Sequence, residues 1–60
     1  MSKHTINGLL ADAYNAILNG KPNTARDLVT VACRAAMMDS TIPAHKVAAI
    51  SRALSLVSAI

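Results

Sequence analysis

The sequence predicts an all-α fold of three short antiparallel helices, over about residues 5–18, 25–38 and 43–59, in a single domain of residues 1–60. In each segment, apolar residues recur at the i, i+3, i+4 spacing of one helix face. Turn-forming residues separate the segments, at Gly20 with Pro22 and at residues 39–41 just before Pro43. The composition, with twelve alanines and Tyr14 as the one aromatic residue, is typical of helices that pack closely together.

The first predicted helix ends at a clear signal. Glycine at position 20 can adopt the left-handed conformation that closes a helix C-terminus, and Pro22 prevents the helix from continuing. The apolar face of this helix comprises Ile6, Leu9, Leu10, Ala13, Tyr14, Ile17 and Leu18. We expect this face to point into the core.

The second predicted helix begins after Thr24, which forms a potential capping box with Asp27. Its sequence is apolar over most of its circumference, which indicates that it is covered on more than one side. One side carries Ala25, Leu28, Val29, Ala32, Cys33 and Ala36, and Val31, Ala35 and Met38 lie beside them. We expect Leu28 to belong to the central core.

The third predicted helix has Thr41 as its cap and Pro43 in its first turn, where the missing N–H is tolerated. The inner stripe of this helix is formed by Val47, Ile50, Leu54 and Val57, with Leu54 in the central core. A second apolar arc is formed by Ala49, Ala53, Leu56 and Ile60.

A chain this short buries only about 60% of the surface that it exposes when unfolded. Cys33 is the one cysteine, so no disulfide within the chain can add stability, and no spacing of Cys and His indicates a zinc site. Small domains without such links commonly oligomerise. We therefore expect a homodimer that completes the core, with Ala49, Ala53, Leu56 and Ile60 at its interface.

The chain has few residues suited to catalysis. It contains no glutamate and no glycine-rich phosphate loop, and Cys33 lies within an apolar pattern, away from His45. An active site needs a nucleophile, a base and an orienting group together. We expect no enzymatic activity, no cofactor and no bound metal, and a cytoplasmic protein that does not enter a membrane, because the longest apolar tract is short and interrupted by serines.

The remaining candidates are surfaces for binding. Arg26, Thr30, Arg34 and Met37 form the polar side of the second helix, and arginine and methionine are enriched at protein interfaces. We therefore expect a small regulator, adaptor or inhibitor that occupies a surface of a larger protein, a type of chain frequent among phage and plasmid accessory proteins. The alternative is a small dimeric, helix-turn-helix-like DNA-binding regulator, because the second and third helices are joined by a short turn and the net charge is +3. Its basic residues are spread over the chain and not clustered, which makes nucleic acid the less favoured partner.

Overall fold

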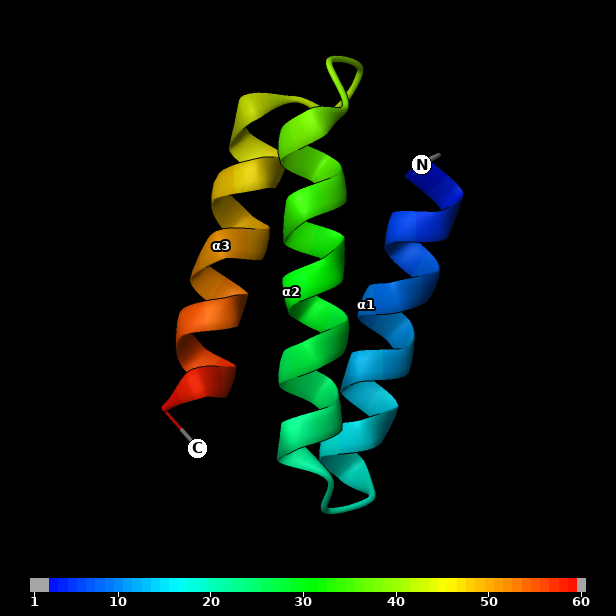
Figure 1. The fold of residues 1–60 in the computed structure, drawn as a ribbon, viewed down its shortest axis with the longest axis vertical. Helices are drawn as coiled ribbons and strands as arrows, with labels where there is room; N and C mark the ends of the chain where they lie inside the picture. Colours follow the sequence, from blue (N-terminus) through cyan, green and yellow to red (C-terminus); the bar gives the residue numbers. More distant parts are fainter. Residues whose placement is uncertain (1–2, 60) are drawn as a thin grey trace.

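The computed structural model describes residues 3–59, and they form three helices with no strand among them. Helix α1 is Lys3–Leu18, α2 is Pro22–Met38 and α3 is Ala44–Ser58. The all-α prediction is confirmed. The helices run alternately down, up and down, with α2 between the other two (Figure 1).

The turn between α1 and α2 forms as the sequence predicts. Gly20 has a φ of 73°. The N–H of Lys21 donates to the carbonyl of Ala16 at 2.8 Å, and the N–H of Gly20 donates to that of Ile17 at 3.0 Å. These two bonds constitute a Schellman motif, which satisfies carbonyls at the end of α1.

The predicted capping box of α2 is wrong. The helix starts three residues earlier, at Pro22, and Thr24 lies inside its first turn. Proline is well suited to that position, since its fixed φ is helical and its missing N–H needs no partner. Lys21 takes the capping position, and its side chain makes no capping hydrogen bond.

The turn between α2 and α3 is organised by Asp39 and not by a Thr41 cap. A carboxylate oxygen of Asp39 accepts hydrogen bonds from the backbone N–H of Thr41 at 2.9 Å and from its hydroxyl at 2.6 Å. Pro43 is the residue that caps α3, and its carbonyl accepts from Lys46 and Val47. The threonine hydroxyl therefore stabilises the turn before the helix begins.

The core lies along the inner side of α2, and alanine forms much of it. The buried residues are Ile6, Ala13 and Ala16 of α1, Ala25, Val29, Ala32, Cys33 and Ala36 of α2, Ile42 of the turn, and Ile50 and Val57 of α3. Leu28 and Leu54 are only half-buried at the edge of this core, so their predicted central position is wrong. The small side chains let α2 pack closely against both neighbours.

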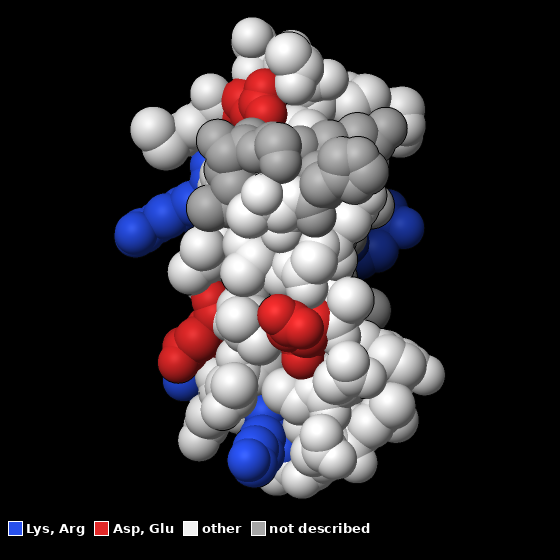
Figure 2. Space-filling view, turned by 90° about the vertical axis from the view of Figure 1, so that its right-hand side faces the viewer, with Lys and Arg blue, Asp and Glu red and all other residues white. Residues whose placement is uncertain are grey.

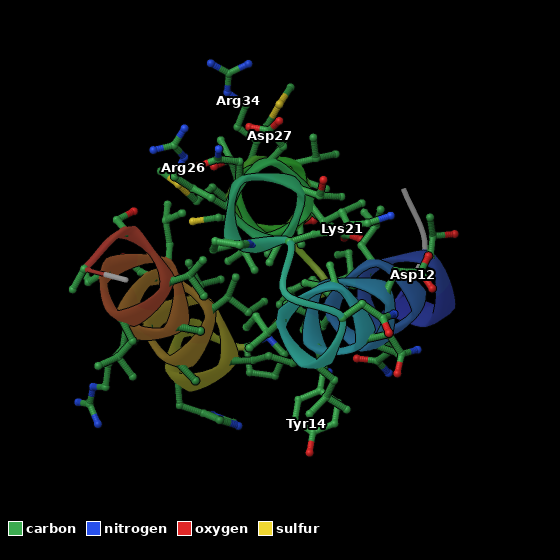
Figure 3. The ribbon with its side chains drawn as sticks, turned by 90° about the horizontal axis from the view of Figure 1, so that it is seen from below. Asp12, Tyr14, Lys21, Arg26, Asp27 and Arg34 are labelled. Carbon is green, nitrogen blue, oxygen red and sulfur yellow. The ribbon has the colours of Figure 1, made fainter. Side chains whose placement is uncertain are left out.

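Helices α1 and α3 do not pack directly on each other. Among the described residues, no Cα of α1 lies within 8 Å of a Cα of α3. Nζ of Lys46 in α3 donates a hydrogen bond to Oδ1 of Asn7 in α1 at 2.8 Å. The fold is therefore a flat slab of 33 × 20 × 13 Å, with α2 on one broad face and α1 and α3 on the other (Figure 3).

Several residues predicted to point inward are exposed. In α1, Tyr14 is 63% exposed, Ile17 37% and Leu18 66%. Figure 3 shows the Tyr14 ring directed away from α2. In α2, Met38 is 87% exposed instead of lying beside the core. The residues of α1 in the buried core are Ile6, Ala13 and Ala16, and the three exposed side chains near its C-terminal end lie outside that core.

Candidate functional site

The outer side of α2 is the most chemically varied surface of the described chain. Figure 3 shows Arg26, Asp27 and Arg34 pointing away from the other two helices. Asp27, Val31, Arg34 and Met38 follow one another at i, i+4, i+7 and i+11, which places them on one line along the helix. All four are exposed, and we call them the outer strip.

The residues predicted for partner binding fall on two lines of α2, not one. Arg26, Thr30 and Met37 lie on a line that also contains the buried Cys33. Arg34 lies on the outer strip, because eight residues at about 100° each rotate it about 80° from Arg26. The two guanidinium groups therefore face different directions from the same helix, as Figure 3 illustrates.

Thr30 is the least available of the predicted residues. It is half-buried, and its hydroxyl donates to the backbone carbonyl of Arg26 at 2.7 Å. That proton satisfies a bond within the helix, so Thr30 has less to offer a partner than its neighbours. Met37, in contrast, is 70% exposed.

The C-terminal end of α2 has two shallow depressions, one on each side of the exposed methionines. The first has a volume of about 600 Å³ and is lined by Val31, Arg34, Ala35, Met38, Asp39 and Ser40. The second, of about 570 Å³, adjoins Met37 and extends over the first turns of α3 to Val47, Ala48 and Ser51. Exposed apolar groups therefore surround both depressions. Sequence reasoning missed Met38 and Val31 here, because it placed both beside the core.

The charged groups are dispersed. Figure 2, which looks onto α1, shows acidic and basic side chains interspersed over a mostly uncharged surface, with no continuous basic area on that face. The carboxylate of Asp39 accepts hydrogen bonds from Thr41. The hydroxyl and the backbone N–H of Thr41 both donate to it and hold its pKa below its usual value of 3.8. Asp39 is therefore ionised at neutral pH, at the edge of both depressions.

The predicted oligomer residues that the structure describes lie on α3 and are exposed or half-buried. Ala49 is exposed, Ala53 is half-buried against the core and Leu56 is 66% exposed. Ile60 lies outside the described residues. Three exposed residues of α1, Tyr14, Ile17 and Leu18, were missed as surface residues. The helical period alone does not show which residues of a wide apolar side point inward.

The structure offers no support for the cysteine–histidine pair. Cys33 is buried and His45 is on the exposed side of α3. Within residues 3–59, no group of three or more His, Cys, Asp or Glu side chains is placed to hold a metal ion. None of the helices described has the length and apolar character needed to cross a membrane.

Comparison of the chain with protein-family models, with curated proteins and with solved structures finds no match.

Proposed function

We propose that this chain is a small non-enzymatic regulator, adaptor or inhibitor that binds a larger protein through the C-terminal end of α2. The observation that carries the proposal is the exposure of Val31, Met37 and Met38 around the guanidinium of Arg34. The core is rich in alanine, whereas these three larger apolar side chains of α2 are exposed to solvent.

Methionine at that position suits a contact surface. Its unbranched thioether side chain adapts to irregular partner surfaces, and its burial removes apolar area from water. Arginine can form paired hydrogen bonds with a carboxylate and also stacks on apolar groups. The outer strip combines both types of contact at the first depression, through Val31, Arg34 and Met38, whereas the exposed side of α3 offers mainly serines, Arg52 and His45.

The chemistry of this surface specifies the kind of partner. Arg26 and Arg34 favour a partner with acidic side chains, and the methionines favour an apolar recess between them. Asp27 and Asp39 lie within or beside the strip, so the partner surface is expected to be mixed and not uniformly acidic. The partner proposed is a protein with an apolar recess bordered by carboxylates.

Duplex DNA is the alternative partner. The two helices of a helix-turn-helix motif cross at about 90–120°. Here α2 and α3 lie side by side over their length (Figure 1), so neither helix projects from the other as a recognition helix does. Together with the dispersed charges, this arrangement favours a protein over DNA as the partner.

The test compares variants in the capture of proteins from the native host. The chain is immobilised as the wild type, as the double variant Arg26→Ala with Arg34→Ala, as Met38→Glu, and as Arg52→Ala, a control that removes an exposed cation from α3. We expect one protein to be captured by the wild type and by Arg52→Ala, and lost from the other two. Alanine is the best helix former, so the arginine substitutions leave α2 intact, which circular dichroism verifies.

The captured protein is then purified and titrated with each variant, alongside a labelled duplex DNA probe at several salt concentrations. Protein binding that the double variant weakens at least about 30-fold supports the proposal, since each contact removed is worth about 1 kcal/mol or more. Equal binding by the wild type and both α2 variants would refute it. Binding to the DNA probe that falls steeply with salt and depends on the arginines would favour the alternative.

A further inference from the structure

We infer that the C-terminal end of α2 is a site of reversible oxidation, where a peroxide converts Met37 and Met38 to sulfoxides and thereby releases the bound partner. The inference rests on the proposed function, because it concerns the regulation of the same surface. The oxidation step itself needs no partner, so it is measured on the chain alone.

Three of the four sulfur atoms of the chain lie within residues 33–38, at the C-terminal end of α2. They belong to Cys33, Met37 and Met38, and the fourth belongs to Met1, which lies outside the described residues. Met38 is 87% exposed and Met37 70%, whereas Cys33 is 8% exposed. Since susceptibility to oxidation follows exposure, a peroxide in solution reaches both thioethers while the folded chain shields the thiol.

The oxidation has a defined balance of atoms and electrons. A lone pair of the methionine sulfur attacks one oxygen of hydrogen peroxide, so that a sulfur–oxygen bond forms and the O–O bond breaks. The other oxygen leaves as water with both hydrogen atoms of the peroxide. The sulfur loses two electrons and the peroxide gains them. Methionine sulfoxide reductases reverse the step with two thiols, which form a disulfide as the sulfoxide oxygen leaves as water.

The fold does not depend on the reduced form of either methionine. Neither side chain belongs to the buried core or to the half-buried apolar residues packed against it. In the free chain the sulfoxide oxygen therefore remains in water, and oxidation buries no polar group. Oxidation thus changes the surface of α2 and leaves the packing of the three helices intact.

The same change is unfavourable once a partner covers the surface. Met38 lines the first depression, beside Val31, and Met37 lines the second. A methionine side chain is apolar, whereas its sulfoxide is polar. Burying the sulfoxide oxygen in an apolar recess without a hydrogen bond weakens binding by roughly 10- to 100-fold.

Arg34 adds a second effect in the oxidised chain. It precedes Met38 by four residues, which makes the two side chains neighbours on the helix surface, and both line the first depression. A thioether sulfur is a weak hydrogen-bond acceptor, and the guanidinium group has several N–H donors. The sulfoxide oxygen is a much stronger acceptor than the thioether. Oxidation of Met38 therefore gives Arg34 an acceptor on its own helix, in competition with the carboxylates of the partner.

The first measurement treats the chain alone with hydrogen peroxide and follows each sulfur by peptide mass spectrometry, in the native and in the urea-unfolded chain. We expect the native rates of Met37 and Met38 to lie within about threefold of the unfolded rates, and Cys33 to react at least about 10-fold more slowly when native. By circular dichroism, the oxidised chain should keep its helix content and a Tm within about 4 °C of the reduced chain.

The second measurement titrates the protein captured from the host with the wild type, Met37→Leu, Met38→Leu and the double variant, each before and after peroxide. Catalase removes the peroxide before the partner is added. Leucine has nearly the volume of methionine and no sulfur, and each variant before peroxide is its own reference, so a change in basal affinity cancels. The double variant keeps Met1 and Cys33 and therefore reports oxidation elsewhere in the chain.

We expect peroxide to raise the dissociation constant of the wild type at least about 10-fold and that of the double variant less than about twofold. The two single variants should show intermediate losses. Treatment of the oxidised wild type with methionine sulfoxide reductases and a thiol should restore its affinity. This last step uses the wild type only, so it remains decisive whatever the basal affinity of the leucine variants.

The inference would be overturned if the native chain protected both methionines from peroxide, or if the oxidised wild type bound as tightly as the reduced chain. Affinity that the reductases do not restore, or an equal loss in the double variant, would overturn it as well. Failure of the proposed function gives a different result, because the unoxidised Met38→Glu variant and the double arginine variant would then bind as tightly as the wild type.

Discussion

The two glycines are expected to respond to alanine with opposite signs. Gly8 lies in the interior of α1 on its exposed side, and Gly20 has a φ of 73° in the turn that follows. A Cβ added at either position meets no atom within 4 Å. Steric contact therefore plays no part in either substitution. The difference in stability between the two variants reports the effect of the backbone conformation at each glycine.

The magnitudes follow from that conformation. In a helix interior, alanine is more favourable than glycine by about 0.5 to 1 kcal/mol, so Gly8→Ala stabilises the fold. In the left-handed region, an L-residue costs about 1 to 2 kcal/mol, so Gly20→Ala destabilises it. The two variants should thus differ by about 2 kcal/mol. For a domain of this size, 1 kcal/mol corresponds to about 4–8 °C in Tm, which gives a difference of roughly 8–16 °C.

The assay is thermal and urea unfolding followed by far-ultraviolet circular dichroism, at one protein concentration for all variants. Gly20→Asn is a useful third variant, because asparagine tolerates the left-handed conformation better than alanine and should lose less stability. The reasoning would be refuted if Gly20→Ala were as stable as the wild type, or if the two alanine variants shifted Tm in the same direction.

Three further predictions concern the core and the second turn. Ile50→Ala removes three carbon atoms from a buried site and should cost about 2 to 4 kcal/mol of stability. Met38→Ala removes three heavy atoms from an exposed site and should leave Tm almost unchanged. Equal shifts in Tm would contradict the burial of Ile50. Cys33 is buried, so a thiol reagent should label the native protein far more slowly than the urea-unfolded chain, and similar rates would contradict that position. The lowered pKa of Asp39 contributes stability that is present above the unfolded-state pKa and is lost as pH falls below about 4. Asp39→Asn should therefore lower Tm at neutral pH but not at low pH, and a pH-independent difference would contradict the role of its charge.

The sequence predicted the number of helices and the place of both turns, because these depend on local chemistry. Gly20 closes α1 as expected. Apolar spacing identified each helix because the segments are long enough for the period to repeat. The start of α2 was predicted less well: Thr24 was expected to cap the helix, whereas the helix begins at Pro22. Proline both ends one helix and suits the first turn of the next, and for Pro22 the prediction rested on the first property alone.

Which residues lie at the centre could not be read from the sequence with the same accuracy. Leu28 and Leu54 were expected in the core because leucine is strongly apolar, but Ala25 and Ala32 lie deeper. When apolar residues cover a wide part of a helix circumference, the sequence does not show which of them face the core. Alanine is compatible with a buried or an exposed position. Tertiary packing selects the alanines, because they allow the closest approach of α2 to its neighbours.

The same ambiguity affected the candidate sites. Arg26, Arg34 and Met37 are exposed as expected, but they lie on two lines of α2 and not on one polar strip. Met38 was missed as a surface residue because the apolar pattern of the second helix placed it beside the core. In this chain, hydrophobicity alone does not identify the exposed apolar residues, because alanines occupy much of the core and several larger apolar side chains lie outside it.

The central claim, that the C-terminal end of α2 binds a protein, is tested most directly by hydrogen exchange. The amides of the chain are compared with and without the protein captured from the host. The account predicts slower exchange on binding for residues 31–42, which include the last turns of α2 and the Asp39 turn, because contact suppresses local opening there. Unchanged exchange in that segment, with new protection confined to α1 or to the exposed side of α3 around Arg52, would contradict it.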